Sequence, residues 1–168
     1  MTTTYVKWGE ATVKLTWKSG MHPSQDHFVT SVHGFCFYKE QILLVDLNHR
    51  GWDFPGGHME GNETSEECFK REAMEEGYVT GDCQLIGSII VDHTQNELWD
   101  EKGKYPKIGY QVFYRMDIDI LHPFNAEYES HQRILISSDK VADYYQDWHE
   151  LYQEILVEAS NLNSNRRN

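Results

Sequence analysis

Apolar and polar residues alternate over several short stretches of the chain, and this period of two is typical of half-buried strands. Ala11–Trp17 alternates in this way, while Phe28–Tyr38 and Gln41–Leu47 are rich in β-branched and aromatic residues. Lys39 and Glu40 separate the last two stretches and predict a short turn between two strands. Further strands are predicted at Gln84–Asp92, Ile108–Asp119 and Ile134–Ile136.

Two other stretches have helical spacing. Thr64 is a suitable N-cap, with Glu67 three residues later to complete a capping box, so a helix is predicted from there to about Glu76. Its candidates for a buried face are Cys68, Phe69 and Ala73. A second helix is predicted over Asp139–Ala159, and we interpret its apolar stripe as core packing rather than as an aromatic cofactor box. That stripe consists of Val141, Tyr144, Tyr145, Trp148, Leu151, Tyr152, Ile155 and Leu156.

The order of these elements predicts a single domain over residues 1–160, followed by a disordered tail at 161–168. Periodicity alone leaves α/β and α+β open. The polar stretch His93–Lys107 contains Gly103 and Pro106 and is predicted to be a long loop between two strands. Because long loops in compact domains are often functional, it is a candidate lid or substrate-selecting loop.

Composition is that of a folded globular protein, with 39% hydrophobic and 13% aromatic residues. The net charge of −12 argues against binding nucleic acid through its phosphates, which requires a basic surface. The three cysteines show no CxxC spacing, so neither a disulfide framework nor a zinc site is expected. No signal peptide and no apolar run of membrane-spanning length is visible, and we expect a soluble, cytoplasmic protein without membrane partners.

Three glutamates, Glu72, Glu75 and Glu76, occupy five consecutive positions of the first predicted helix. At spacings of three and four residues they share one helix face, where like charges repel each other. A solvated acidic face is the common reason for such a pattern. A divalent cation is the alternative, because Mg²⁺ takes oxygen ligands from carboxylates and substrate phosphates.

The surrounding residues favour the cation. Pro55-Gly56-Gly57 forms a turn just before the acidic stretch, and glycine lets backbone approach a ligand closely. Arg71 precedes Glu75 by four residues and can hold carboxylates through charge-assisted hydrogen bonds. Glu63 lies eight residues before this arginine. Together these residues make a chance cluster of glutamates a poor explanation.

The run GHMEGNETSEECFKREAMEEGYV resembles the Nudix box, the signature of the Nudix hydrolases. In the family pattern, Ala73 stands at an aliphatic position, and Tyr78 stands where a glycine is usual. Gly77 precedes that position by one residue, so we expect the helix to end one residue sooner. The positions that match the pattern are Gly57, Glu63, Arg71, Glu72, Glu75, Glu76 and Val79.

The resemblance implies an α/β fold, an α/β/α sandwich around a mixed sheet, and metal-dependent hydrolysis of a nucleoside diphosphate linked to another group. It implies Mg²⁺, with Mn²⁺ as an alternative. Within the implied catalytic set, Glu63 and Arg71 are expected to organise the loop and helix, and one of the glutamates could accept the proton of the attacking water. The metal ligands that it implies are Glu72, Glu76, Glu75 and the Gly56 carbonyl.

Family members often add an acidic residue from outside the box as a ligand or base. Glu127 and Glu129 are the candidates here, with Glu129 preferred, although a solvated loop glutamate is an equal alternative for each. Arg50, His58 and Phe54 are candidate substrate-binding residues. Arg50 could bind a phosphate, with an ion pair to an aspartate as the alternative, and His58 follows the glycine turn. Phe54 could be a platform for a base, although aromatic residues of strands are more often core. The remaining histidines are scattered and form no ligand pair.

For the substrate, the resemblance to small bacterial-type, MutT-like members favours a nucleoside triphosphate, cleaved to the monophosphate and pyrophosphate. Members that act on ADP-ribose commonly carry a proline beyond the box, and members that act on diadenosine polyphosphates carry a tyrosine. Residues 93–96 contain neither. ADP-ribose or a nucleotide sugar, an RNA 5′ end, and a non-catalytic nucleotide sensor remain alternatives. Many members dimerise, which leaves a homodimer open.

Overall fold

A computed structural model describes residues 1–24 and 28–166, while His27 and residues 167–168 of the predicted tail lie outside the described residues. In the described part of the chain, one mixed sheet contains nine strands. The strands are β1 (Thr2–Trp8), β2 (Ala11–Ser19), β3 (Val29–Tyr38), β4 (Gln41–Leu47), β5 (Gly51–Asp53), β6 (Gly56–His58), β7 (Val79–Asp92), β8 (Ile108–Leu121) and β9 (Ser130–Ser137). The helices are α1 (Ser65–Gly77), α2 (Val141–Tyr144), α3 (Glu150–Arg166) and the short 3₁₀ helix η2 (Ser138–Lys140).

The strands run in the order β1-β2-β7-β8-β3-β4-β5, with β6 beside β3 and β9 beside β4. In the described part of the chain, the paired strands are antiparallel except β3 and β8, which are parallel. Strands β3 and β4 pair only at their shared turn, where Lys39 and Glu40 both have positive φ. Beyond this turn β6 takes the place of β4 beside β3, which brings the double glycine turn into the sheet.

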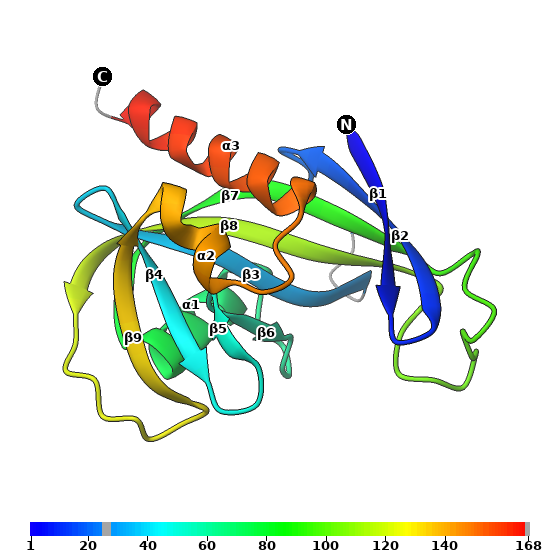
Figure 1. Cartoon of the computed structure of the whole chain (residues 1–168), viewed down its shortest axis with the longest axis horizontal. Helices are drawn as coiled ribbons and strands as arrows, with labels where there is room; N and C mark the ends of the chain where they lie inside the picture. Colours follow the sequence, from blue (N-terminus) through cyan, green and yellow to red (C-terminus); the bar gives the residue numbers. More distant parts are fainter. Residues whose placement is uncertain (25–27, 167–168) are drawn as a thin grey trace.

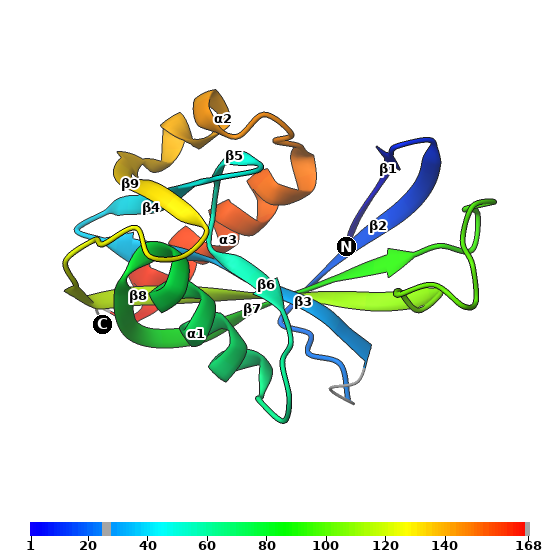
Figure 2. The same cartoon turned by 90° about the horizontal axis from the view of Figure 1, so that it is seen from below.

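Helices cover both faces of the sheet, which confirms the predicted α/β/α sandwich (Figure 1). Seen from below, α1 lies on one side of β7, β8 and β3, and α2 and α3 lie on the other (Figure 2). The α1 side is closed by Cys68, Phe69 and Ala73, all fully buried as predicted. The α3 side is closed by residues of the predicted apolar stripe, among them Leu151 and Ile155.

The beginning of α1 confirms the predicted cap, because the Thr64 hydroxyl accepts a hydrogen bond from the Glu67 amide at 3.2 Å. The expected early end of the helix is wrong. Gly77 remains helical, and Tyr78 itself adopts the left-handed conformation, with φ 56 and ψ 43. The glycine serves a different purpose, since a Cβ on Gly77 would lie 2.6 Å from Leu43 Cδ2 on β4.

Tyr78 is held in this conformation by packing. Its side chain is only 3% exposed, its ring lies 4.9 Å from that of Phe124, and its hydroxyl accepts a hydrogen bond from the Glu127 amide at 2.8 Å. Arg133 of β9 donates to the carbonyls of Gly77 and Tyr78 at 2.8 and 3.2 Å, which satisfies the end of the helix. Tertiary contacts therefore offset the cost of a non-glycine residue at positive φ.

The second predicted helix is broken. Residues 141–144 form α2 and residues 150–166 form α3, and Tyr145 between them has an extended backbone. Tyr145 leaves the helix because its ring stacks on Phe54 at 5.4 Å, within an aromatic cluster that also contains Trp148 and Tyr152. Helix α3 continues to Arg166, into the stretch 161–168 that the sequence predicts as a tail.

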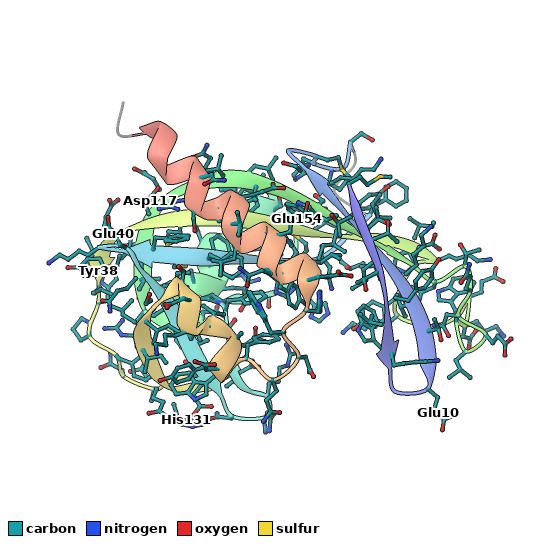
Figure 3. All side chains as sticks on the ribbon, turned by 45° about the horizontal axis from the view of Figure 1, so that its top comes forward. Glu10, Tyr38, Glu40, Asp117, His131 and Glu154 are labelled. Atoms are coloured by element: carbon teal, nitrogen blue, oxygen red, sulfur yellow. The ribbon has the colours of Figure 1, made fainter. Side chains whose placement is uncertain are left out.

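The hairpin of β1 and β2 lies at one end of the molecule, and Figure 3 shows Glu10 at its tip, far from Tyr38 and Glu40 at the β3–β4 turn. Strand β1 was not predicted. The loop between β7 and β8 was predicted, and it lies beside this hairpin (Figure 1). Among the described helices, none is both long enough and apolar enough to cross a membrane.

Candidate active site

A cleft of about 590 Å³ lies where α1, the double glycine turn, the β1–β2 hairpin and the β7–β8 loop meet. Its volume is in the usual range for sites that hold a small organic ligand. It brings together six of the predicted site residues, along with several residues that the sequence did not single out. The six are Arg50, Gly56, His58, Glu72, Glu76 and Glu129.

Helix α1 presents Glu72 and Glu76 to the glycine turn of β6. The Gly56 amide donates a hydrogen bond to Glu76 Oε1 at 3.1 Å, so backbone and carboxylate are in direct contact. At Gly57, a Cβ would lie 2.4 Å from Glu72 Oε1. The second glycine of the turn is therefore required by the close approach of this carboxylate.

Arg71 organises the carboxylates around this turn. Its Nη2 donates to Glu63 Oε1 at 2.8 Å and its Nε donates to Glu63 Oε2 at 3.0 Å, which makes a bidentate pair. Its Nη1 donates to Glu72 Oε1 at 3.0 Å and to Glu75 Oε2 at 3.4 Å. Nη2 also donates to the His58 carbonyl at 3.2 Å. One guanidinium thus links the loop after β6 to two successive turns of α1.

The pKa values of the carboxylates in this cluster are shifted in opposite directions. Hydrogen bonds from Arg71 lower the pKa of Glu63 to about 2, so this residue stays charged. Burial raises the pKa values of Glu72 and Glu76, and the repulsion between acidic neighbours adds to the effect. Without a cation, burial and this repulsion therefore favour the protonated form of the pair.

The donor set of this cleft fits a hard divalent cation. Within residues 1–24 and 28–166, no three His, Cys, Asp or Glu side chains already converge as a ready metal site. Two carboxylates, those of Glu72 and Glu76, do converge on the cleft. Mg²⁺ is commonly held by one or two carboxylates, while substrate phosphates and water complete its coordination shell. Glu72 and Glu76 share buried negative charge that a proton or a cation must balance, and Glu129 borders the same cleft.

Four of the predicted site residues do not line the cleft, namely Phe54, Glu63, Arg71 and Glu75. Phe54 is 3% exposed and belongs to the α3-side core, so its prediction as a base platform is wrong. It lies behind His33, with ring centroids 6.0 Å apart, and its own stacking partner is Tyr145. Glu75 faces Arg71 and does not line the cleft, while Glu127, the alternative to Glu129, is exposed beyond it.

The sequence did not reveal several cleft residues, because they come from elements that converge only in the folded chain. Ser31, His33 and Gln111 form part of the floor, and Trp8, His93 and Tyr105 line it from the hairpin and the β7–β8 loop. His33 was one of the scattered histidines. The one clue to its role is its position on β3, where it pairs directly with Gly56 of the glycine turn. Burial lowers its pKa to about 4, so it is neutral at physiological pH.

Replacing Gly57 by Ala tests the packing of this turn. The added methyl group forces Glu72 away from its place, and we expect kcat/KM for any substrate to fall at least about tenfold, because a small displacement of a catalytic group is costly. Steady-state kinetics at saturating Mg²⁺ measures the effect. Gly61 gives the matched control, because Gly61→Asn places a side chain in open space at φ +51, and activity should remain within about twofold of the parent. Equal losses in both variants would contradict this role of Gly57.

A helix with paired carboxylates, packed against a double glycine turn at the edge of a mixed sheet, is the arrangement of a phosphoanhydride hydrolase that works with a divalent cation. The family model of the NUDIX domain matches residues 27–163 of this sequence. The chain therefore belongs to the Nudix family, and it is a MutT-like Nudix pyrophosphohydrolase.

One protein is similar to this chain in sequence, and two solved structures are similar to it in fold. The chain is 34% identical over 88 residues to an 8-oxo-dGTP diphosphatase of Proteus vulgaris, a match that covers 42% of this chain and 76% of that protein. The fold is similar to that of a pyrophosphohydrolase from Bacillus subtilis, with a TM-score of 0.71, 21% identity, and coverage of 96% and 97% of the two chains. An ADP-ribose pyrophosphatase from Streptococcus suis is similar at a TM-score of 0.55 and 20% identity over 78% and 90%.

Proposed function

We propose that this enzyme hydrolyses nucleoside triphosphates to the nucleoside monophosphate and pyrophosphate, with Mg²⁺ as its metal and Mn²⁺ as a substitute. The observation that carries the proposal is the cleft itself. The partly buried Glu72 and the buried Glu76 line it beside a backbone turn, and the exposed aromatic side chains of Trp8 and Tyr105 line the same volume of about 590 Å³. The Proteus vulgaris relative is named for a reaction on a nucleoside triphosphate, which supports this class of substrate.

The residues of the cleft divide the work as follows. Glu72 and Glu76, with the Gly56 carbonyl and Glu129, would hold the metal, and Glu75 would join them by leaving Arg71. When bound there, a cation would neutralise diphosphate charge and make water a better nucleophile. Arg50 and His58 line the cleft beside these carboxylates and would bind the phosphate oxygens.

The chemical step forms one bond and breaks one. The oxygen of a water molecule bonds to a phosphorus, the bridging P–O bond breaks, and pyrophosphate leaves with the electron pair of that bond. The proton released by the water would go to a glutamate of the cleft, and because clustered carboxylates titrate together this role belongs to the cluster rather than to one residue.

A substrate panel tests the proposal. Purified enzyme is given nucleoside triphosphates, 8-oxo-dGTP, ADP-ribose, a nucleotide sugar and 5′-triphosphorylated RNA, with Mg²⁺, with Mn²⁺ and with chelator. We expect pyrophosphate rather than phosphate to be released from triphosphates, and only when metal is present. Turnover confined to ADP-ribose or the sugar nucleotide would contradict the proposal that nucleoside triphosphates are the substrates. Turnover that persists in chelator would overturn the metal assignment.

A further inference from the structure

The end of the cleft beside the N-terminal hairpin holds an exposed indole ring. Trp8, the last residue of β1, is 45% exposed and lines the cleft. Its ring lies 6.0 Å from that of His93, which is 7% exposed and is fixed by a hydrogen bond between its Nδ1 and the Asn96 amide at 3.0 Å. The indole thus packs against the buried His93 on one side and faces the open cleft on another. A supported aromatic ring of this kind is a stacking platform for a planar ligand.

A second exposed aromatic ring, Tyr105, also lines the cleft, but it already has neighbours of its own. Its ring lies 6.3 Å from that of His58, and the Lys104 ammonium lies 5.5 Å from its centroid. His58 directly follows the glycine turn, so Tyr105 belongs to the end of the cleft where the phosphates are proposed to bind. Trp8 is the aromatic surface that remains for the other end of a nucleotide.

Between these two ends the floor carries an amide group. The register of the sheet places His58, Ser31 and Gln111 side by side on β6, β3 and β8. With strands about 4.8 Å apart, Gln111 lies about 10 Å from the strand of the glycine turn. Ser31 is engaged with His33 at 2.9 Å, whereas no residue of the described chain makes a hydrogen bond to the Gln111 amide. This amide is a donor and an acceptor that face the cleft without a protein partner.

We propose that this end of the cleft is a nucleobase subsite, in which the base stacks on Trp8 and one edge is hydrogen-bonded to the Gln111 amide. The inference rests on the proposed function, because it assumes that the substrate of this site is a nucleotide. An amide matches a base edge with one donor beside one acceptor. Adenine has such an edge at N6 and N7, and 8-oxoguanine has one at N7 and O6, whereas guanine presents two acceptors there. Read on this N7 edge, adenine and 8-oxoguanine are favoured over guanine, which would have to turn its O6 and N1–H edge towards the amide instead.

The stacking is tested by comparing ATP with inorganic tripolyphosphate, which has the phosphoanhydride but no base. In Trp8→Ala, the ratio of kcat/KM for ATP to that for tripolyphosphate should fall about tenfold or more, on the scale of one lost base–aromatic stack. Trp8→Phe should restore most of the ratio. Tyr5→Ala is the matched control, because Tyr5 is an exposed aromatic of the same strand that lies outside the cleft, and both rates should be unchanged.

The edge contact is tested by the choice among bases. The wild type should prefer ATP and 8-oxo-dGTP over GTP and dGTP, and Gln111→Leu should bring these rates to within about threefold of one another. Comparing the wild-type rates for ATP and 8-oxo-dGTP shows which of the two bases the subsite favours. If Gln111→Leu lowered all rates equally and kept the preference, Gln111 would be a structural residue and this half of the proposal would be wrong.

A binding measurement separates the subsite from the catalytic proposal. AMP has no phosphoanhydride to cleave, so calorimetry can compare it with ribose 5-phosphate in chelator. AMP should bind about tenfold tighter or more, and Trp8→Ala should remove this difference. If no triphosphate is hydrolysed but this result is obtained, the proposed function fails and the subsite stands. If triphosphates are hydrolysed and Trp8→Ala changes neither the binding nor the rate ratio, the subsite is overturned.

Discussion

Replacement of Glu76 by Gln is expected to lower kcat/KM about 1000-fold, on the scale of losing one group that stabilises charge in the transition state. The substitution keeps the shape of the side chain, and its amide oxygen can still accept the hydrogen bond that the Gly56 amide donates to Glu76. What it removes is the negative charge that the cation requires. Steady-state rates at rising Mg²⁺ concentration measure the loss, and circular dichroism confirms that the variant is folded.

The same variant is expected to be more stable than the wild type in chelator at pH 8. The pKa of Glu76 is raised in the folded state by burial and by Glu72. A raised pKa in the folded state gives stability that is fully present below the unfolded pKa and is lost as the pH rises through the folded value. Glutamine does not titrate. The gain in melting temperature should therefore be small at pH 5 and grow towards pH 8.

Glu10, the exposed residue at the tip of the β1–β2 hairpin, gives a matched control for this substitution (Figure 3). Glu10→Gln makes the same chemical change far from the cleft, and neither activity nor the pH dependence of stability should move. If Glu76→Gln kept more than a tenth of the activity, Glu76 would not be a metal ligand. If its gain in stability did not grow with pH, Glu76 would already be charged in the metal-free protein at pH 5.

The parts of this site that could be predicted are those encoded within one continuous segment. The contacts of Arg71 with Glu63 and Glu75, and the approach of Glu72 to Gly57, follow from spacing on one loop and one helix. Local rules also predicted the Thr64 cap, because the cap and its partner are three residues apart. Glu129 could be proposed from the family, but only the fold places it at the cleft and Glu127 outside.

The parts that could not be predicted depend on contacts between distant segments. The sequence left Phe54 open between a base platform and the core, and packing with Tyr145 and Tyr152 makes it a core residue. The same contacts end α2, although the helical spacing of the apolar residues continues through the break. The position of Trp8 at the cleft could not be predicted, because β1 is recognised as a strand only by its pairing with β2. Burial of Tyr78 likewise overrides the backbone preference that would place a glycine at the helix end.

Replacement of Arg71 by Ala is expected to lower both stability and metal affinity. Its guanidinium is the shared donor to Glu63, Glu72 and Glu75, and without it these carboxylates repel each other. Loss of hydrogen bonds to charged groups costs about 2 kcal/mol, which corresponds to about 5 °C in melting temperature for a domain of this size. Because Arg71 orients Glu72 without itself lying in the cleft, the concentration of Mg²⁺ for half-maximal activity should rise about 10- to 100-fold.

Lys70→Ala is the matched control for Arg71→Ala, because Lys70 is the adjacent residue of α1 and its ion pair with Glu66 is exposed. Lys70→Ala should change stability by less than about 1 kcal/mol and leave the Mg²⁺ requirement unchanged. Arg71→Lys should resemble Arg71→Ala, since an ammonium group cannot reproduce the fork that reaches Glu63 twice. A merely structural arginine would lower the melting temperature without moving the Mg²⁺ requirement. A positioning arginine moves both, and excess Mg²⁺ then recovers part of kcat, because a cation at Glu72 and Glu76 screens the repulsion that the guanidinium no longer balances.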